Sequence, residues 1–291
     1  VFLIMPFGVM HAHALLRAER MKELAAINTA QVASDHVLTA VLALLGFGAW
    51  AIVLPKLLTA PIWLVGMLRT KAWTPNLSAG FAPIAGILKF SWPVLGSELM
   101  CACRDQLDKF IVSLMFGVEA LGLYYFAFNA GLGVSTALNR AFSNAVYPHL
   151  CAARDQLGAY RKALRNLGIP FIIVYGAQAA LALVYVPIVF GQTWVSAAPL
   201  VAILCLGGPA RLLVDAARMK ARAEGASGRD FRISIGLTVS VLLPFALCAQ
   251  QGLAVAAIIS VTCATVFAIA VTQQSVRAST PNQIHTMGAT S

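Results

Sequence analysis

Charged residues are scarce in this chain, and their scarcity identifies its solvent. Asp, Glu, Lys and Arg make up 11% of the 291 residues, whereas a soluble domain carries about 25%. Apolar residues make up 59%, and the mean hydropathy is +0.80. A soluble globular domain is therefore excluded, and the composition indicates an integral membrane protein.

Patterns that bind metals, nucleotides or disulfide frameworks are missing from the sequence as well. No two histidines are four residues apart, and most of the cysteines fall inside apolar runs. No G-x-x-x-x-G-K-[ST] loop occurs. We therefore expect no metal site, no resident cofactor and no disulfide framework.

Long apolar runs fill the sequence instead. Each is about 20 residues long, which is enough to cross a hydrocarbon core of ~30 Å as a helix. The alternation over ~10 residues that a membrane β-barrel needs is not seen. The sequence predicts an all-α polytopic membrane protein. Its expected spans cover roughly 27–47, 49–68, 85–117, 121–147, 168–190, 196–214, 232–249 and 252–273, behind an apolar fragment at 1–16.

Lysine and arginine are unevenly distributed among the loops, which predicts an orientation. They follow the runs that end near 16, 68, 147 and 214, whereas the loops near 47, 118, 193 and 250 carry none. By the positive-inside rule the basic loops and the C-terminal tail are cytoplasmic. We place in or beside the last basic loop Arg211, Arg218, Lys220, Arg222, Arg229 and Arg232.

The net charge of +10 is then mainly a topology signal. Nucleic acid is not an expected partner, because the basic loops lack interleaved aromatic residues and any recognition-module pattern. The chain begins with Val1 inside an apolar run, so we expect further spans upstream of it.

One segment, CRDQLDKF at 103–110, places four charges inside a predicted span. Because that span ends near 117, the charges lie roughly 12–20 Å inward, near the bilayer midplane. A charge is costly there unless it pairs or faces water. Arg104 with Asp108, and Asp105 with Lys109, have opposite signs four residues apart, and we expect them to neutralise each other along the helix.

The next predicted span carries a polar stripe with helical spacing. Its members are Tyr125, Asn129, Gly133, Thr136, Arg140 and Asn144. Two interpretations stay open: the polar residues of both spans hold helices together, or they line a hydrated solute pathway. An arginine between asparagines on one face favours the pathway, because the packing of small residues does not require it.

The stretch 90–131 resembles the start of the second bundle in bacterial polysaccharide transporters; it reads FSWPVLGSELMCACRDQLDKFIVSLMFGVEALGLYYFAFNAG. These proteins are the lipid-linked oligosaccharide flippases of the multidrug/oligosaccharidyl-lipid/polysaccharide exporter superfamily. QLDK at 106–109 stands at the family's N-x-x-D-K-like motif, and 117–127 matches its G-x-x-x-L-G-x-Y-x-x-A turn. Similar stretches follow the family's order: LLGFGAWAIV, YPHLCAARDQLGAYRKALR, FGQTWVSAAPLVAIL and GLAVAAIISV. Arg104 and Gln106 depart from the family pattern, which has Asn or small polar residues there.

The resemblance implies part of a two-bundle, twelve-helix exporter fold, N-terminally truncated in this chain. Residues 1–75 would be the remainder of the N-terminal bundle and 76–291 the C-terminal six-helix bundle. It implies a flippase, not an enzyme, that moves an undecaprenyl-pyrophosphate-linked oligosaccharide across the bacterial inner membrane by alternating access. The expected partners are that substrate, membrane lipids, H⁺ or Na⁺ as coupling ion, and polysaccharide polymerase machinery. The residues expected to line the substrate cavity are Arg104, Asp105, Asp108, Lys109, Asn129, Arg140 and Asn144.

Two other classes of function stay open. A membrane enzyme of polysaccharide assembly needs a sizeable outer loop with catalytic charges, and the predicted outer loops are short. An ion-coupled multidrug exporter of the same superfamily is harder to separate, because acidic residues within the membrane can bind H⁺ or Na⁺. Basic residues on the expected cavity wall disfavour cationic drugs as cargo.

Overall fold

The structure is a computed structural model of the whole chain, in which residues 5–18, 20–74 and 84–277 are described. The regular elements of these ranges are helices, and the ranges contain no strand. The chain divides into two compact units, Val1–Ala82 and Pro83–Ser291. Six helical stretches of the described residues are long and apolar enough to cross a membrane. They are Trp50–Arg69, Gly86–Ala152, Gln156–Phe190, Gln192–Ala223, Ser227–Gln251 and Leu253–Arg277. The prediction of an all-α polytopic membrane protein is confirmed.

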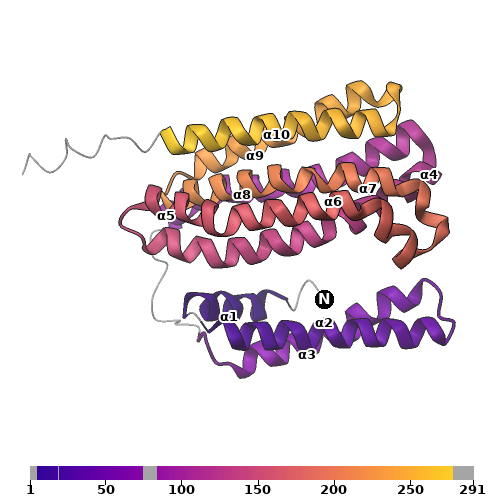
Figure 1. Cartoon of the computed structure of the whole chain (residues 1–291). Helices are drawn as coiled ribbons and strands as arrows, with labels where there is room; N and C mark the ends of the chain where they lie inside the picture. Colours follow the sequence, from indigo (N-terminus) through magenta and orange to yellow (C-terminus); the bar gives the residue numbers. More distant parts are fainter. Residues whose placement is uncertain (1–4, 19, 75–83, 278–291) are drawn as a thin grey trace, which may run out of the picture. The chain divides into compact units, whose positions relative to one another are not determined.

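The first unit holds α1 (Met5–Arg17), α2 (Met21–Leu44) and α3 (Trp50–Arg69), and α3 packs against the other two (Figure 1). α2 covers the expected span 27–47 up to Leu44. It is not one of the six apolar stretches, because polar residues are spread along it. Lys56 Nζ on α3 lies 3.3 Å from Asp35 Oδ2 on α2. The Trp63 indole donates a hydrogen bond to Asn28 at 3.0 Å. Polar side chains thus link α2 to α3 at two levels.

The second unit is a bundle whose long helices run roughly along one direction in Figure 1. Its helices are α4 (Ile84–Ala152), α5 (Gln156–Ala163), α6 (Ile169–Phe190), α7 (Ala198–Cys205), α8 (Gly207–Ala223), α9 (Ser227–Cys248) and α10 (Leu253–Arg277). A π turn at Leu164–Gly168 and 3-10 turns at Gln192–Ala197 and Ala249–Gln251 join some of them. α8 and α9 pack against each other, and each contacts α4 and α10. Side chains from these four helices therefore meet inside the unit.

α4 consists of two helices joined at Gly117. The backbone there is not helical, with φ 81° and ψ 179°, a region that glycine enters without a steric penalty. The break lies between the expected spans 85–117 and 121–147. One long element thus contains both of them.

Alanine occupies many of the buried positions between the helices of the second unit. Ala127, Ala182, Ala256 and Ala268 are each 0% exposed. In lipid, association of apolar helices gains little from the hydrophobic effect, so close approach and dispersion carry the packing. At Gly131 on α4, a Cβ atom would lie 3.1 Å from the carbonyl oxygen of Val201 on α7. Small residues therefore bring these helix backbones close together.

The basic segment after 214 is helical, which corrects the cytoplasmic loop expected there. α8 continues to Ala223, and only Glu224–Ala226 separate it from α9. Arg218 and Lys220 lie on α8 and are 7% and 1% exposed. The helix persists because carboxylates on neighbouring turns and helices pair with these cations.

Candidate functional site

A groove of about 330 Å³ opens between α4, α8 and α9. This volume lies at the lower end of the range for small-molecule sites. Four arginines and two aspartates among its lining residues give a surplus of two positive charges. The lining residues are Arg104, Asp105, Arg140, Arg211, Asp215 and Arg218, with Cys101, Thr136, Asn139, Ser143, Asn144 and Leu237. Such a lining suits a ligand that carries both anionic and hydroxyl groups.

Arg104 is buried but incompletely paired. Its side chain is on α4, and the residue is 6% exposed. Arg104 Nε lies 3.5 Å from Asp105 Oδ1, yet neither Nε nor Nη1 has a hydrogen-bond partner among the described residues. A buried guanidinium that lacks acceptors is energetically costly. A ligand that supplies anionic oxygens would remove that cost.

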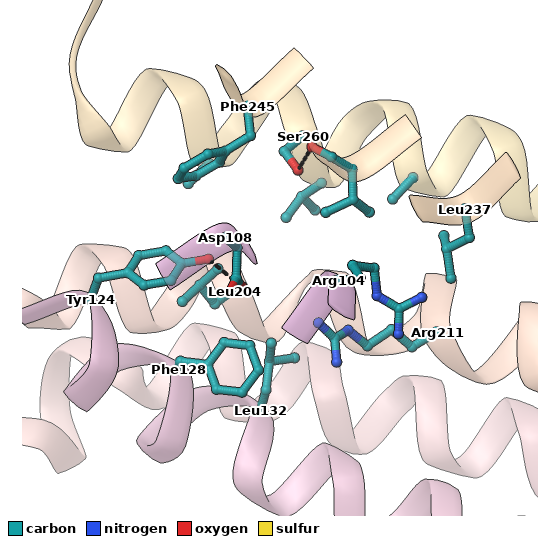
Figure 2. A pocket seen from close by; sticks show the side chains of 15 residues that line it. Arg104, Asp108, Tyr124, Phe128, Leu132, Leu204, Arg211, Leu237, Phe245 and Ser260 are labelled. Carbon is teal, nitrogen blue, oxygen red and sulfur yellow. Dashed lines mark hydrogen bonds between the residues drawn. The ribbon is translucent and has the colours of Figure 1, made fainter. Parts of the chain in front are cut away.

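Figure 2 shows a smaller cavity of about 40 Å³, which shares Arg104 and Arg211 with the groove. The guanidinium groups of these two arginines lie near each other in the view, while Asp108 and Tyr124 lie in another part of the cavity. Arg211 Nη2 on α8 is 3.2 Å from Asp105 Oδ1. Asp105 is therefore the common partner of two cations, and its single charge cannot neutralise both.

Asp108 does not pair with Arg104 in the way the sequence predicted. Its Oδ2 accepts a hydrogen bond from the Tyr124 hydroxyl at 3.0 Å, and its Oδ1 accepts from the Lys109 backbone N–H at 2.6 Å. Lys109 Nζ donates to the Asp105 carbonyl, lies 3.5 Å from Asp108 and sits 3.9 Å from the Phe128 ring centre. The prediction of ion pairs between side chains four residues apart was therefore wrong. Tyr124 and Arg211, on other helical segments, bind Asp108 and Asp105 instead.

The polar stripe predicted on the second half of α4 divides into two parts. Thr136, Arg140 and Asn144 line the groove. Asn129 is exposed, and its amide donates to the Tyr125 carbonyl on its own helix at 2.8 Å. Of the seven predicted cavity residues, four lie on the groove: Arg104, Asp105, Arg140 and Asn144. Asp108 lies on the smaller cavity. The role of all seven residues in substrate binding stays a prediction.

The sequence prediction of the cavity did not include the contribution of α8. Arg211, Asp215 and Arg218 all line the groove. The signal was available, since these residues and Arg222 follow one another at spacings of four, three and four, which is the spacing of one helix face. Counting them as loop residues hid that pattern.

A cluster of two arginines and two carboxylates shares Arg218 with the groove and joins three helices. Its members are Glu98 on α4, Arg218 and Arg222 on α8, and Asp230 on α9. The Asp230 carboxylate is 0% exposed and accepts from Nε of Arg218 at 2.8 Å and of Arg222 at 2.6 Å. Glu98 accepts from Nη2 of the same arginines at 3.0 and 2.6 Å. This arginine–carboxylate cluster ties α4, α8 and α9 together.

Comparison with known proteins identifies the family of the chain. The profile of a family described as polysaccharide biosynthesis protein matches residues 1–199. The chain belongs to the polysaccharide biosynthesis protein family. The resemblance to polysaccharide transporters seen in the sequence is thereby confirmed.

Two relatives of this polysaccharide biosynthesis protein have names that refer to glycans. Lipopolysaccharide biosynthesis protein WzxC of Escherichia coli (strain K12) is 23% identical over 213 residues, which cover 71% of this chain and 43% of WzxC. Succinoglycan biosynthesis transport protein ExoT of Rhizobium meliloti (strain 1021) is 26% identical over 88 residues, which cover 30% of this chain and 18% of ExoT. The chain thus matches less than half of the length of these relatives. No solved structure matches it.

Proposed function

We propose that the chain forms part of a flippase that moves an undecaprenyl-pyrophosphate-linked oligosaccharide across the bacterial inner membrane. The observation that carries the proposal is the buried, under-paired guanidinium of Arg104 on a groove with surplus positive charge. The membership in the polysaccharide biosynthesis protein family and the name of ExoT as a transport protein support export over enzymatic chemistry.

The groove offers partners for both chemical parts of such a head group. Arg104 and Arg140 present guanidinium N–H groups, which suit pairs of phosphate oxygens. Within the described residues, Arg140 forms no hydrogen bond or ion pair, and it is exposed. Asn144 and Thr136 add amide and hydroxyl groups that can bind sugar hydroxyls. The polyprenyl tail remains in the hydrocarbon while alternating access opens the groove to each side in turn.

A multidrug exporter of the same superfamily is the second candidate. The surplus of arginines on the groove repels a cationic drug and attracts an anionic head group. Coupling to H⁺ or Na⁺ belongs to our proposal, with Asp108 as its carboxylate, since this residue is 4% exposed and lines the smaller cavity. Polysaccharide polymerase machinery would receive the head group after transport.

The proposed function is tested by measuring on which face of the inner membrane the lipid-linked oligosaccharide lies. Deletion of the gene that encodes this chain should trap the glycolipid on the inner face, out of reach of a lectin added to spheroplasts. Expression of the protein should restore lectin binding at the outer face. Restored efflux of a cationic dye, with lectin binding still absent, would favour the drug exporter and contradict our proposal.

Cysteine labelling tests the proposed orientation, with the basic segments and the C-terminus in the cytoplasm. In a Cys151→Ser background, Glu119→Cys and Gln192→Cys should react with an impermeant thiol reagent added to spheroplasts. Lys162→Cys and Gly228→Cys should react only after the membrane is opened. All four positions are exposed, and they avoid the nearby glycines with positive φ. The opposite labelling pattern would reverse the topology.

A further inference from the structure

A second large cavity, of about 320 Å³, lies between the beginning of α9 and the end of α10. None of its lining residues lines the groove. Arg229 and Arg232, on the first turns of α9, and Gln274, near the end of α10, supply polar lining. Val271 and Phe267 line it one and two turns further into α10, so the wall becomes apolar over roughly 10 Å of helix.

Positive charge on the polar part of this cavity exceeds what its neighbours neutralise. Arg229 Nη1 pairs with Glu224 Oε2 at 2.8 Å, but Glu224 also accepts from Lys220 at 2.6 Å. Both oxygens of the nearby Asp230 are occupied by the arginine–carboxylate cluster. In the described part of the chain, Arg232 makes no hydrogen bond or ion pair. An anion bound at the cavity would therefore face at least one arginine without a competing carboxylate.

The apolar part of the cavity is formed by both helices. Ile233 on α9 faces the same space as Val271 and Phe267 on α10. A Cβ atom at Gly236 would lie 2.5 Å from the Phe267 ring, so the absence of a side chain on α9 leaves room for that ring. The cavity thus joins cationic groups near the helix ends to an apolar wall further along the helices.

We propose that this cavity binds an anionic phospholipid. Its phosphate lies at Arg229 and Arg232, and the upper part of an acyl chain lies along Ile233, Val271 and Phe267. In the orientation proposed above this cavity lies at the cytoplasmic side, where basic cavities between transmembrane helices suit lipid head groups. A soluble phosphate would use the arginines but leave the apolar wall without a ligand. The inference does not depend on the substrate that the groove carries.

Lipid titration of the purified chain, monitored by native mass spectrometry from detergent, tests this site. Wild-type protein should retain phosphatidylglycerol in preference to phosphatidylcholine. Arg229→Gln together with Arg232→Gln should weaken phosphatidylglycerol binding roughly 30-fold, from the attraction of two arginines to an anionic lipid. Arg161→Gln together with Arg165→Gln is the matched control, because it removes two exposed arginines outside the cavity and should leave the affinity unchanged.

A second variant separates the cavity from general surface charge and from folding defects. Gln274→Trp keeps every arginine but fills the space, so it should also abolish the preference for phosphatidylglycerol. Glycerol 3-phosphate should not displace the bound lipid at equal concentration. The proposal is overturned if both arginine pairs lower the affinity equally, if Gln274→Trp binds lipid as the wild type does, or if glycerol 3-phosphate competes fully. If the variant with both Arg229→Gln and Arg232→Gln does not fold, the lipid preference of Gln274→Trp decides the question.

Discussion

Asp230→Ala is expected to destabilise the protein by about 3–5 kcal/mol, because it leaves buried guanidinium charge without its partner. The Asp230 carboxylate is 0% exposed and accepts from Nε of both Arg218 and Arg222. Once it is removed, Arg222 retains only Glu98, whose side chain is 57% exposed, while Arg218 retains Glu98 and Asp215. The midpoint temperature of unfolding should fall by roughly 6–20 °C for a unit of this size. It is measured as the loss of the monodisperse elution peak after heating.

The control for this change is an ion pair at the surface. Glu23→Gln breaks the contact between Arg20 and Glu23, whose side chains are 44% and 46% exposed, and it should leave the midpoint unchanged. Arg222→Leu added to Asp230→Ala should recover part of the loss, because it removes one of the two guanidinium groups that lost a partner. A wild-type midpoint for Asp230→Ala would mean that the cluster contributes nothing to stability.

Arg104→Gln is expected to lower glycan export roughly tenfold to a hundredfold while the protein accumulates normally. The expected size follows from losing one or more hydrogen bonds between a charged donor and phosphate. Arg104→Lys should restore only part of the activity, because an ammonium group does not bind phosphate oxygens in the same bidentate way. The measurement is outer-face lipid-linked oligosaccharide per amount of protein in the membrane.

Two further variants make this prediction decisive. Arg161→Gln removes an exposed arginine outside the groove and should export at the wild-type rate. The charge exchange Arg104→Asp with Asp108→Arg moves the cation by one helical turn, about 5 Å, and also removes the acceptor of the Tyr124 hydroxyl. We expect it to abolish export. Wild-type export by the exchanged protein would remove Arg104 and Asp108 from the proposed site.

Features that depend on local sequence were predictable. Apolar runs of sufficient length predicted the helices. The end of one expected span at 117 coincides with the break in α4 at Gly117. Helical spacing on the second half of α4 predicted that Thr136, Arg140 and Asn144 share a face, and all three line one groove. Each of these inferences needs only the geometry of one helix.

Features that depend on partners far away in the sequence were not predictable. Glu98 and Arg218 are 120 residues apart, and no local spacing indicates that they meet. Pairing within one helix was the natural expectation for Arg104 and Asp108. Instead Asp108 accepts from the Tyr124 hydroxyl, and Asp105 pairs with Arg211, which only the packing of the bundle brings near. The sequence thus predicted that the charges lie in an apolar span, but it did not predict the contacts that they make.

The arginine–carboxylate cluster also sets an order in the assembly of the chain. Glu98 and Arg222 are 124 residues apart, so at ~5–20 residues per second Glu98 leaves the ribosome roughly 6–25 s before Arg222. The half-exposed side chain of Glu98 can stay hydrated during that wait. Asp230 follows Arg222 by only eight residues, and it completes the cluster almost as soon as the arginines emerge. The cluster on α4 and α8 is therefore complete only after the first turn of α9 has been made.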